Sequence, residues 1–555
     1  MKHELERRIA EALRALGISP LSVRVEHPSD IAHGDYATSA ALQYAKITGT
    51  PPRQLAEKLV ETLGAIDGVE KIEIAGPGFI NFRISEDSLA SAIARAREED
   101  MWGANVVLKG RQIMVEYTDP NPFKEFHIGH LMSNAIGESI SRLLQFSGAH
   151  ITRANYQGDV GPHVAKALWA LMQTSSGALG TSAGLGSAYA AGAHAYESDE
   201  NAKKEIDEIN KKVYDRSDEK INQLYDEGKK LSLAHFEEIY KTLGTKFDVY
   251  FFESQSAPKG IALVQSHPEV FEKSDGATVY KGEEQGLHTR VFITSLGLPT
   301  YEAKDLGLLQ LKREKGDLDT SITVTASEQS DYFKVVLAAA KEIGELRPIA
   351  EKTRHITHGM MRLPTGKMSS RTGDVITGES LLAELAAIAQ ERAKESRAEN
   401  TEELAQQVAV AAIKFQILRQ SSGKDIIFDR ERALSLEGDS GPYLQYAHAR
   451  THQIVERAKS EGIAADIDPT AACGAVGQLL VRFPDIVEEA ASLMEPHVLT
   501  TYLTALAGAF NSWYAAEHIL DGTPAAAHKV ALTDAVRTTL KNGLWVLGIP
   551  APEKM

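Results

Sequence analysis

Two histidines three residues apart open a helical stretch and could bind phosphate. They lie in Phe126-His127-Ile128-Gly129-His130, after an apolar strand and a proline-containing loop. A helix N-terminus presents free backbone N–H groups and the positive end of the helix dipole, which suit phosphate oxygens. Gly129 would let a nucleotide base approach the backbone. Taken alone, the motif is as consistent with a helix start carrying two surface histidines as with a nucleotide site.

A second motif carries two cations between glycines. Gly366-Lys367-Met368-Ser369-Ser370-Arg371-Thr372-Gly373 lies about 240 residues further along, after a strand-like run at 355–361. A glycine-flanked loop with lysine and arginine can clamp a polyphosphate, although alone it is more typical of a solvated surface loop. Because both motifs occur in one chain with α/β patterning, together they are a more specific indication of a nucleotide polyphosphate site than either motif alone.

The two motifs resemble the HIGH and KMSKS signatures of class I aminoacyl-tRNA synthetases. The wider sequence resembles the arginyl-tRNA synthetases over nearly the whole chain. Further matching segments are 34–36, 76–82, 115–121, 299–305, 428–450 and Asp534-Ala535-Val536-Arg537, the last close to the tetrapeptide that names the family's anticodon-binding domain. The resemblance implies an enzyme that activates L-arginine with ATP and transfers it to the 3′ end of tRNA(Arg).

Arginine recognition requires carboxylates in fork geometry around a planar guanidinium. Glu116 ends the first strand, at the carboxyl edge where doubly wound sheets bind ligands, and Tyr301 and Asp305 are four residues apart at a strand-to-helix junction. Without the resemblance, Asp305 would be interpreted as a helix N-cap and Tyr301 as a core aromatic. The family's arginine-binding positions fall on Glu116, Asn121, His127, Tyr301, Asp305 and Gln329. We expect Asp305, Glu116 and Tyr301 to hold the guanidinium, and Asn121 and Gln329 the α-amino end.

The sequence departs from the class I pattern at the second lysine of KMSKS, which is Ser370 here. Loss of that cation should cost ~3 kcal/mol or more of transition-state stabilisation, so we expect Lys124, just upstream of the histidine motif, to replace it. The catalytic positions implied are Lys124, His127, His130, Lys367 and Arg371. The ATP-binding positions implied are Phe126, His127, Gly129, His130, Met360, Lys367, Met368 and Ser369. A second departure is Tyr332-Phe333, where the family more often has His-Phe.

Composition restricts the partners and cofactors. Sixty Lys and Arg against 76 Asp and Glu give a net charge of −16, so a tRNA must meet a locally basic face. The single cysteine excludes a disulfide framework and multi-cysteine zinc sites, and favours a reducing, cytoplasmic location. No secretory signal and no run of 18 apolar residues occur, so we expect no membrane partner. We expect ATP to bring Mg²⁺, and no zinc.

The elements that position these residues predict three domains. Residues 1–95 read as a small α+β domain with a β-hairpin around Gly76-Pro77-Gly78, which the resemblance assigns to the tRNA elbow. Residues 96–385 begin with a βαβ unit and predict a Rossmann-type doubly wound parallel sheet, with a helical insertion at about 170–250. We interpret 172–192 as a surface loop and 199–246 as a helical pair or one longer helix. Residues 386–555 are helical and resemble an anticodon-binding domain.

The tRNA-reading residues are the least determined part of the sequence. The candidates are Phe79, Asn81, Tyr443, Tyr446 and Trp513, because exposed bases stack on aromatic side chains. For each of them a core role is equally consistent. The resemblance further implies a monomer, and an enzyme that needs bound tRNA before it activates arginine.

Several alternatives remain. The nearest is another class I synthetase, of the cysteinyl or glutamyl type, although one cysteine cannot supply the cysteinyl type's zinc ligands. More distant are a small-molecule nucleotidylyltransferase and a tRNA-binding relative that has lost activity. Gly438-Asp439-Ser440-Gly441-Pro442 resembles a serine-protease nucleophile segment but is better interpreted as a helix-opening turn capped by Asp439 or Ser440.

Overall fold

The computed structural model describes residues 1–555 apart from 174–180, 363, 365–375 and 394–399. Its central element is a five-stranded parallel sheet with strand order β11-β10-β4-β5-β6. The strands are β4 (Gln112–Glu116), β5 (His150–Gln157), β6 (Val249–Phe252), β10 (Thr320–Ala326) and β11 (Thr353–His358). The chain starts in the middle, runs outwards through β5 and β6, and returns to the other side of β4. This is the doubly wound order, so the predicted Rossmann-type core is confirmed.

The strand order reverses between β4 and β10, whose register pairs Glu116 with Thr323. Helix α5 (Ile128–Phe146) follows β4, and α11 (Tyr301–Glu314) precedes β10. In an open parallel sheet, the carboxyl ends of the strands at such a reversal leave a crevice for a ligand. Both predicted parts of the site, the histidine motif and the Tyr301–Asp305 turn, are therefore carried by elements that flank the reversal.

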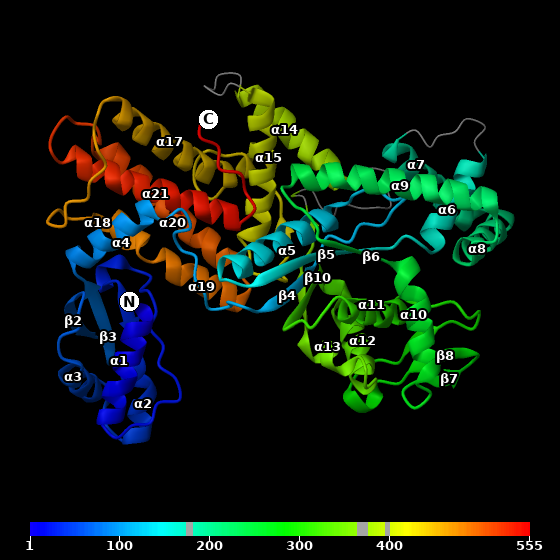
Figure 1. The fold of residues 1–555 in the computed structure, drawn as a ribbon, viewed down its shortest axis with the longest axis horizontal. Helices are drawn as coiled ribbons and strands as arrows, with labels where there is room; N and C mark the ends of the chain where they lie inside the picture. Colours follow the sequence, from blue (N-terminus) through cyan, green and yellow to red (C-terminus); the bar gives the residue numbers. More distant parts are fainter. Residues whose placement is uncertain (174–180, 363, 365–375, 394–399) are drawn as a thin grey trace.

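A helical insertion separates β5 from β6. It comprises α6 (Pro162–Gln173), α7 (Ser182–Ser198), α8 (Glu200–Asp215) and α9 (Glu219–Thr242), at the opposite end of the molecule from the C-terminal helices (Figure 1). The helical pair predicted at 199–246 is confirmed, but the loop predicted at 172–192 is wrong over α7, while 174–180 lies outside the described residues. The small residues serve close packing, since a Cβ at Gly192 would lie 2.0 Å from the carbonyl oxygen of Lys166.

The second half of the catalytic region adds a small antiparallel sheet and four helices. The sheet has the order β7-β8-β9, and α10 packs against α11. The elements are β7 (Glu272–Ser274), β8 (Ala277–Tyr280), β9 (Arg290–Ile293), α10 (Glu253–Ser266), α12 (Ser330–Glu342), α13 (Arg347–Lys352) and the two-residue strand β12 (Met361–Arg362). Together with α11 they enclose a separate apolar core beside the main sheet.

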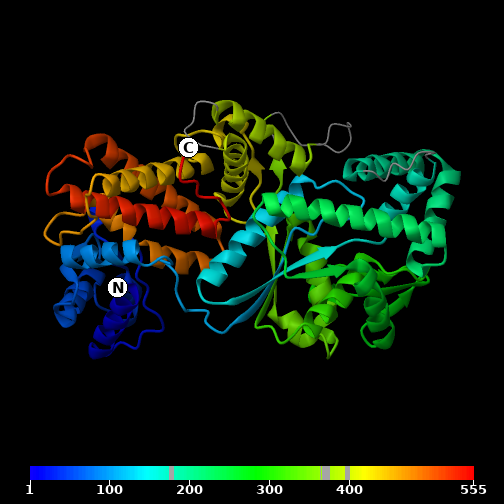
Figure 2. The same cartoon turned by 45° about the horizontal axis from the view of Figure 1, so that its top comes forward.

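The N-terminal region is a small α+β unit, as predicted. Strands β2 and β3 form the predicted hairpin and pair with β1 in the order β1-β3-β2. Its elements are α1 (Lys2–Ala15), β1 (Tyr36–Thr38), α2 (Ala40–Thr48), α3 (Pro52–Leu63), β2 (Val69–Ala75), β3 (Phe79–Ile84) and α4 (Glu86–Glu98). It lies against the C-terminal helices (Figures 1 and 2), where the ring of His27 is 3.1 Å from the carboxylate of Asp485.

The C-terminal region is helical, as predicted. Ser440 caps α17, accepting the backbone N–H of Tyr443 at 3.0 Å, so the helix-opening turn predicted at Gly438–Pro442 is confirmed. The elements are α14 (Gly378–Ala393), α15 (Thr401–Leu418), β13 (Ile426–Ile427), α16 (Arg430–Ala433), α17 (Gly441–Ser460), α18 (Gly474–Leu480), α19 (Phe483–Leu493), α20 (Pro496–Ala516) and α21 (Ala526–Val546). Within the described ranges, no helix is both long and apolar enough to span a membrane.

Candidate active site

The histidine motif forms the first turn of α5, with His127 as its N-cap. The Nδ1 atom of His130 accepts the backbone N–H of His127 at 3.1 Å, so the proton of the neutral His130 ring lies on Nε2. The two rings stack with their centroids 3.5 Å apart. A Cβ at Gly129 would lie 3.0 Å from the His127 ring, so the glycine makes room for this stack.

Both histidines are uncharged at neutral pH. Burial, followed by the positive charge of Lys124, lowers the pKa of His127 to about 4. Burial and then His127 itself lower the pKa of His130 well below its usual value. His127 is nevertheless exposed, so a ligand can reach its ring. The pair can therefore bind phosphate through N–H donors, while positive charge has to come from lysine or arginine.

Lys124 supplies such a charge beside the two histidines. Its Nζ lies 5.0 Å from the ring centroid of Tyr189 on α7, and burial followed by the nearby Lys166 lowers its pKa. Phe126 is buried, with its ring centroid 5.1 Å from that of His130, so its side chain packs against the histidine ring. The start of α5 thus presents two neutral donors and one desolvated lysine.

The basic loop itself falls outside the described residues, and with it Lys367, Met368, Ser369, Ser370 and Arg371. Both of its flanks are described. Before the loop, Met360 is 36% exposed and donates its N–H to Asp425 at 2.9 Å. After it, Thr377 forms a bridge with His127, and the N–H of Gly378 donates to the Phe126 carbonyl at 2.8 Å. The residues that follow the basic loop therefore contact the histidine motif directly.

The exit of β4 is conformationally strained. Thr118 and Asp119 have positive φ values of 80° and 47°, which cost a non-glycine residue about 1–3 kcal/mol each. Two hydrogen bonds hold them there: the Thr118 N–H donates to Ser133 Oγ at 2.9 Å, and Asp119 Oδ1 accepts the Tyr156 N–H at 2.7 Å. The turn brings the side chain of Asn121 against Gly158, at the end of β5, where a Cβ would lie 2.3 Å from Asn121 Oδ1.

Three carboxylates, Glu116, Asp119 and Asp305, influence one another where β4 and α11 meet, and we call them the acidic cluster. The ammonium of Lys312 lies 2.9 Å from Glu116 Oε2, an ion pair without the alignment of a hydrogen bond. In a neighbouring ion pair, Lys304 Nζ lies 2.5 Å from Glu253 Oε2, so these two charges compensate each other. If all three cluster carboxylates are ionised, one ammonium leaves two negative charges without a partner charge.

The pKa values of the acidic cluster reflect this excess charge. Burial is the largest cause of the rise in the pKa of Asp305 to about 7; the negative charges of Glu116 and Glu253 add to this rise, and the Tyr332 hydroxyl and Lys312 oppose it. Burial, followed by Glu116, raises the pKa of Asp119 well above its usual value. Asp305 is also partly open to solvent. Desolvated, incompletely compensated carboxylates that a ligand can reach are suited to binding a cation.

The remaining predicted ligands, Tyr301 and Gln329, lie on α11 and directly after β10, the elements that flank the strand reversal. Tyr301, the first residue of α11, is 63% exposed, so it is not a core aromatic. Asp305 lies one turn further along, and the N-cap is Thr300, so Asp305 is not a helix cap either. Gln329 is exposed at the end of a 3₁₀ turn (Ser327–Gln329) directly after β10. The structure joins Glu116 and Asp305 in one cluster and leaves Tyr301 and Gln329 accessible.

Sequence reasoning missed two members of this site, Asp119 and Lys312. A signal was present for both. Asp119 is an acid three residues beyond Glu116 in the loop that leaves the strand, and Lys312 follows Asp305 by seven residues, which is two helical turns on the same face of α11.

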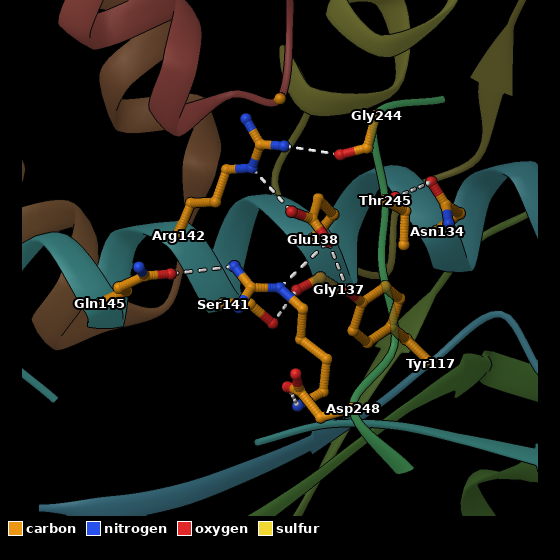
Figure 3. Close-up of polar contacts among 12 residues, drawn as sticks. Tyr117, Asn134, Gly137, Glu138, Ser141, Arg142, Gln145, Gly244, Thr245 and Asp248 are labelled. Atoms are coloured by element: carbon orange, nitrogen blue, oxygen red, sulfur yellow. Dashed lines mark hydrogen bonds and ion pairs between the residues drawn. The ribbon is translucent and has the colours of Figure 1, made fainter. Parts of the chain in front are cut away.

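A second buried carboxylate, Glu138 on α5, has a full set of partners (Figure 3). Its oxygens lie 2.7 Å from Arg142 Nε, 3.3 Å from Arg153 Nε and 2.5 Å from the Tyr117 hydroxyl. Burial would raise the pKa of Glu138, but the two guanidinium groups and the hydroxyl hold it below its usual value. Arg142 also donates to the carbonyls of Gly244 and Trp545, at 2.7 and 2.8 Å, so this cluster joins α5 to the insertion and to α21.

The predicted tRNA contacts lie in both terminal regions. Phe79 is 42% exposed at the start of β3, and Asn81 is half-buried two residues later. Tyr446 on α17 accepts a hydrogen bond from Arg450 at 3.1 Å, whose guanidinium stacks on its ring at 4.6 Å. Tyr443 and Trp513 are partly buried against the C-terminal core. Of these five candidates, Phe79 is exposed, whereas Asn81, Tyr443, Tyr446 and Trp513 are all partly buried.

Comparisons with known proteins agree over the whole chain. Three family models match: "tRNA synthetases class I (R), catalytic domain" over 96–430, "DALR anticodon binding domain" over 444–555, and "Arginyl tRNA synthetase N terminal domain" over 3–84. An arginine–tRNA ligase of Limosilactobacillus reuteri is 30% identical over 567 residues, which cover 100% of both chains. Among solved structures, the Thermus thermophilus arginyl-tRNA synthetase is similar with a TM-score of 0.84 at 28% identity, again covering 100% of both chains. The Plasmodium falciparum enzyme shares the fold, with a TM-score of 0.79 at 19% identity and coverage of 100% of this chain and 99% of that one.

Proposed function

Since the chain belongs to the arginyl-tRNA synthetase family, the enzymes that join arginine to tRNA, we propose that the acidic cluster is its arginine site and the start of α5 its ATP site. In the first step an oxygen of the arginine carboxylate attacks the α-phosphorus of ATP, forming arginyl-adenylate and releasing pyrophosphate. In the second, a ribose hydroxyl of the terminal tRNA adenosine attacks the activated carbonyl and releases AMP.

The observation that carries the arginine site is the excess of buried carboxylate at the strand reversal. Asp305 and Glu116 hold the guanidinium, and Tyr301 covers it from the start of α11. Asn121 and Gln329 hold the α-amino end, His127 is a further arginine-binding residue, and the arginine carboxylate points towards the ATP site. Asp119, which sequence reasoning did not include, adds negative charge on the same side. The guanidinium supplies the positive charge that the cluster lacks.

The ATP site acts by charge and alignment rather than by proton transfer. Lys124, Lys367 and Arg371 neutralise the phosphates, and the neutral rings of His127 and His130 donate N–H groups to them. Phe126, Gly129, Met360, Met368 and Ser369 complete the nucleotide contacts. Mg²⁺ arrives with ATP and adds positive charge to the phosphates when bound. The return of the chain from Thr377 onto His127 supports a joint action of the two motifs.

Residues 96–385 form the catalytic domain, and the two terminal regions bind the tRNA. Residues 1–95 contact its elbow through Phe79 and Asn81. Residues 386–555 bind the anticodon through Tyr443, Tyr446 and Trp513. A monomer, a cytoplasmic location and a requirement for tRNA in arginine activation remain predictions from sequence. Activation at full rate without tRNA would contradict the last of these.

Amino-acid-dependent ATP–pyrophosphate exchange over all twenty amino acids, with total tRNA present, tests the proposal. We expect exchange with arginine, and rejection of lysine and citrulline by about four orders of magnitude in kcat/KM, because either one leaves buried carboxylates unpaired. Comparable exchange with lysine would contradict the assignment of the acidic cluster to the guanidinium.

A further inference from the structure

Tyr332, the first of the two residues that depart from the family's more frequent His-Phe, contacts the acidic cluster directly. From α12, its hydroxyl donates a hydrogen bond to Asp305 Oδ2. The guanidinium carbon of Arg290 lies 5.7 Å from the Tyr332 ring centroid, and Phe333 packs edge-on against the ring at 5.6 Å. The ring is therefore fixed from two sides, and its hydroxyl is aimed at the carboxylate that we assign to the guanidinium.

The two principal carboxylates, Glu116 and Asp305, are held differently, the first by an ion pair and the second by a hydrogen bond. Lys312 lies at Oε2 of Glu116, and Tyr332 donates to Oδ2 of Asp305, so each carboxylate has one oxygen engaged by the protein. Among the described residues, no group forms a hydrogen bond or ion pair with the second oxygen, Glu116 Oε1 or Asp305 Oδ1. A guanidinium between them would then receive one oxygen from each carboxylate instead of a bidentate fork from either one.

We propose that Tyr332 is a specificity-determining positioning residue, which engages Oδ2 of Asp305 so that Oδ1 alone is offered to the arginine guanidinium. The proposal rests on the arginine site described above. It gives a role to the residue that stands where the family more often has histidine, because the phenol O–H is a hydrogen-bond donor.

The same hydrogen bond affects the charge of Asp305. The charged and titratable groups around this carboxylate are Glu116 from β4, Asp119 from the loop after β4, Tyr156 from β5, Glu253 from α10, Tyr301 and Lys312 from α11, and Tyr332 from α12. Burial, Glu116 and Glu253 raise the pKa of Asp305, whereas Tyr332 and Lys312 lower it. Removing the hydroxyl should therefore move the pKa of Asp305 upwards and leave a smaller fraction of it ionised at neutral pH.

The test is Tyr332→Phe in the full chain, assayed by arginine-dependent ATP–pyrophosphate exchange with tRNA between pH 6 and 9. We expect the KM for arginine at pH 7 to rise roughly tenfold, the effect of losing one hydrogen bond to a charged group. The KM for ATP should stay within about twofold. The pH below which arginine binding weakens should move upwards, a shift that a merely structural loss would not produce.

Tyr280→Phe is the matched control. Its hydroxyl donates to Glu342 at the other end of α12, at 2.6 Å, in the same apolar core. It should leave the KM for arginine and its pH profile unchanged. The proposal is overturned if Tyr332→Phe keeps the wild-type arginine KM and pH profile, or if the KM values for arginine and ATP rise equally. Asp305→Asn tests the arginine site separately from the role of Tyr332. An unchanged arginine KM in that variant would refute the arginine site itself.

Discussion

Two buried carboxylate clusters lie at opposite faces of the exit from β4, and they differ in how completely their charge is compensated. Glu138 has two arginines and the Tyr117 hydroxyl, and its pKa lies below the usual value. The acidic cluster has one lysine for three carboxylates, and the pKa of Asp305 lies at about 7. Adjacent residues of one chain segment, Glu116 and Tyr117, belong to the two different clusters.

This difference separates a structural ion cluster from the proposed arginine site. A buried charge with a full set of partners holds elements together, and removing one partner leaves the others desolvated and unpaired. A buried charge with too few partners weakens the empty protein, and the ligand that completes it gains the missing interaction. The comparison predicts opposite consequences for substitutions in the two clusters: loss of stability at Glu138 and loss of substrate at Asp305.

The largest effect is expected for Glu138→Ala. Arg142 and Arg153 would be left without their carboxylate, which should reduce the free energy of unfolding by about 3–5 kcal/mol. Thermal and urea unfolding measure the loss, and the KM for arginine of the folded fraction should stay within about twofold. Asp317→Ala, at the exposed ion pair with Lys352, is the control and should change stability by less than about 1 kcal/mol. If Glu138→Ala were as stable as this control, the two clusters would no longer differ in their contribution to stability.

For Asp305→Asn we expect weaker arginine binding without a loss of stability. The KM for arginine should rise by about 100-fold or more, equivalent to roughly 3 kcal/mol, because the guanidinium loses a charged partner in a desolvated pocket. The KM for ATP should change little. Since the substitution removes a buried, incompletely compensated charge, the melting temperature without arginine should not fall at pH 8. A variant that melts well below the wild type while keeping its arginine KM would reverse the roles assigned to the two clusters.

Much of this comparison could be predicted from the sequence. The doubly wound sheet follows from an apolar strand, a glycine-ended helix and a second strand, and the placement of Glu116 at the end of β4 follows from where the apolar run stops. The Tyr301–Asp305 spacing also placed both residues correctly on one helix. These inferences rest on short-range patterns that a single strand or helix expresses on its own.

What the sequence did not reveal depends on contacts between distant segments. Nothing in the run 118–121 indicates that Thr118 and Asp119 adopt positive φ, because the bonds that hold them come from α5 and β5. Tyr332 was recognised as unusual, but its partner Asp305 is 27 residues away in the chain. The helix α7 was misread because glycine signals both loops and close packing, and only the position of Lys166 distinguishes the two.

The pH dependence of arginine binding offers a smaller and sharper test. The pKa of Asp305, raised to about 7, means that this carboxylate is mostly protonated at pH 6 and mostly ionised at pH 8. The KM for arginine should therefore fall about tenfold from pH 6 to pH 8, as one ionisation with this pKa requires. His127, with a pKa of about 4, does not titrate in this window. A KM independent of pH across the range would show that Asp305 is already ionised in the free enzyme.

The smallest effect distinguishes two tyrosines that make the same kind of bond. Tyr117 donates to Glu138 as Tyr332 donates to Asp305, so Tyr117→Phe and Tyr332→Phe each remove one hydroxyl from one carboxylate. Because two arginines remain on Glu138, Tyr117→Phe should lower the free energy of unfolding by about 1 kcal/mol and leave the KM for arginine and its pH profile unchanged. Exchange kinetics and urea unfolding on both variants make the comparison. If Tyr117→Phe also raised the arginine KM, the two clusters would act as one unit across β4, and compensation of charge would no longer separate structure from binding.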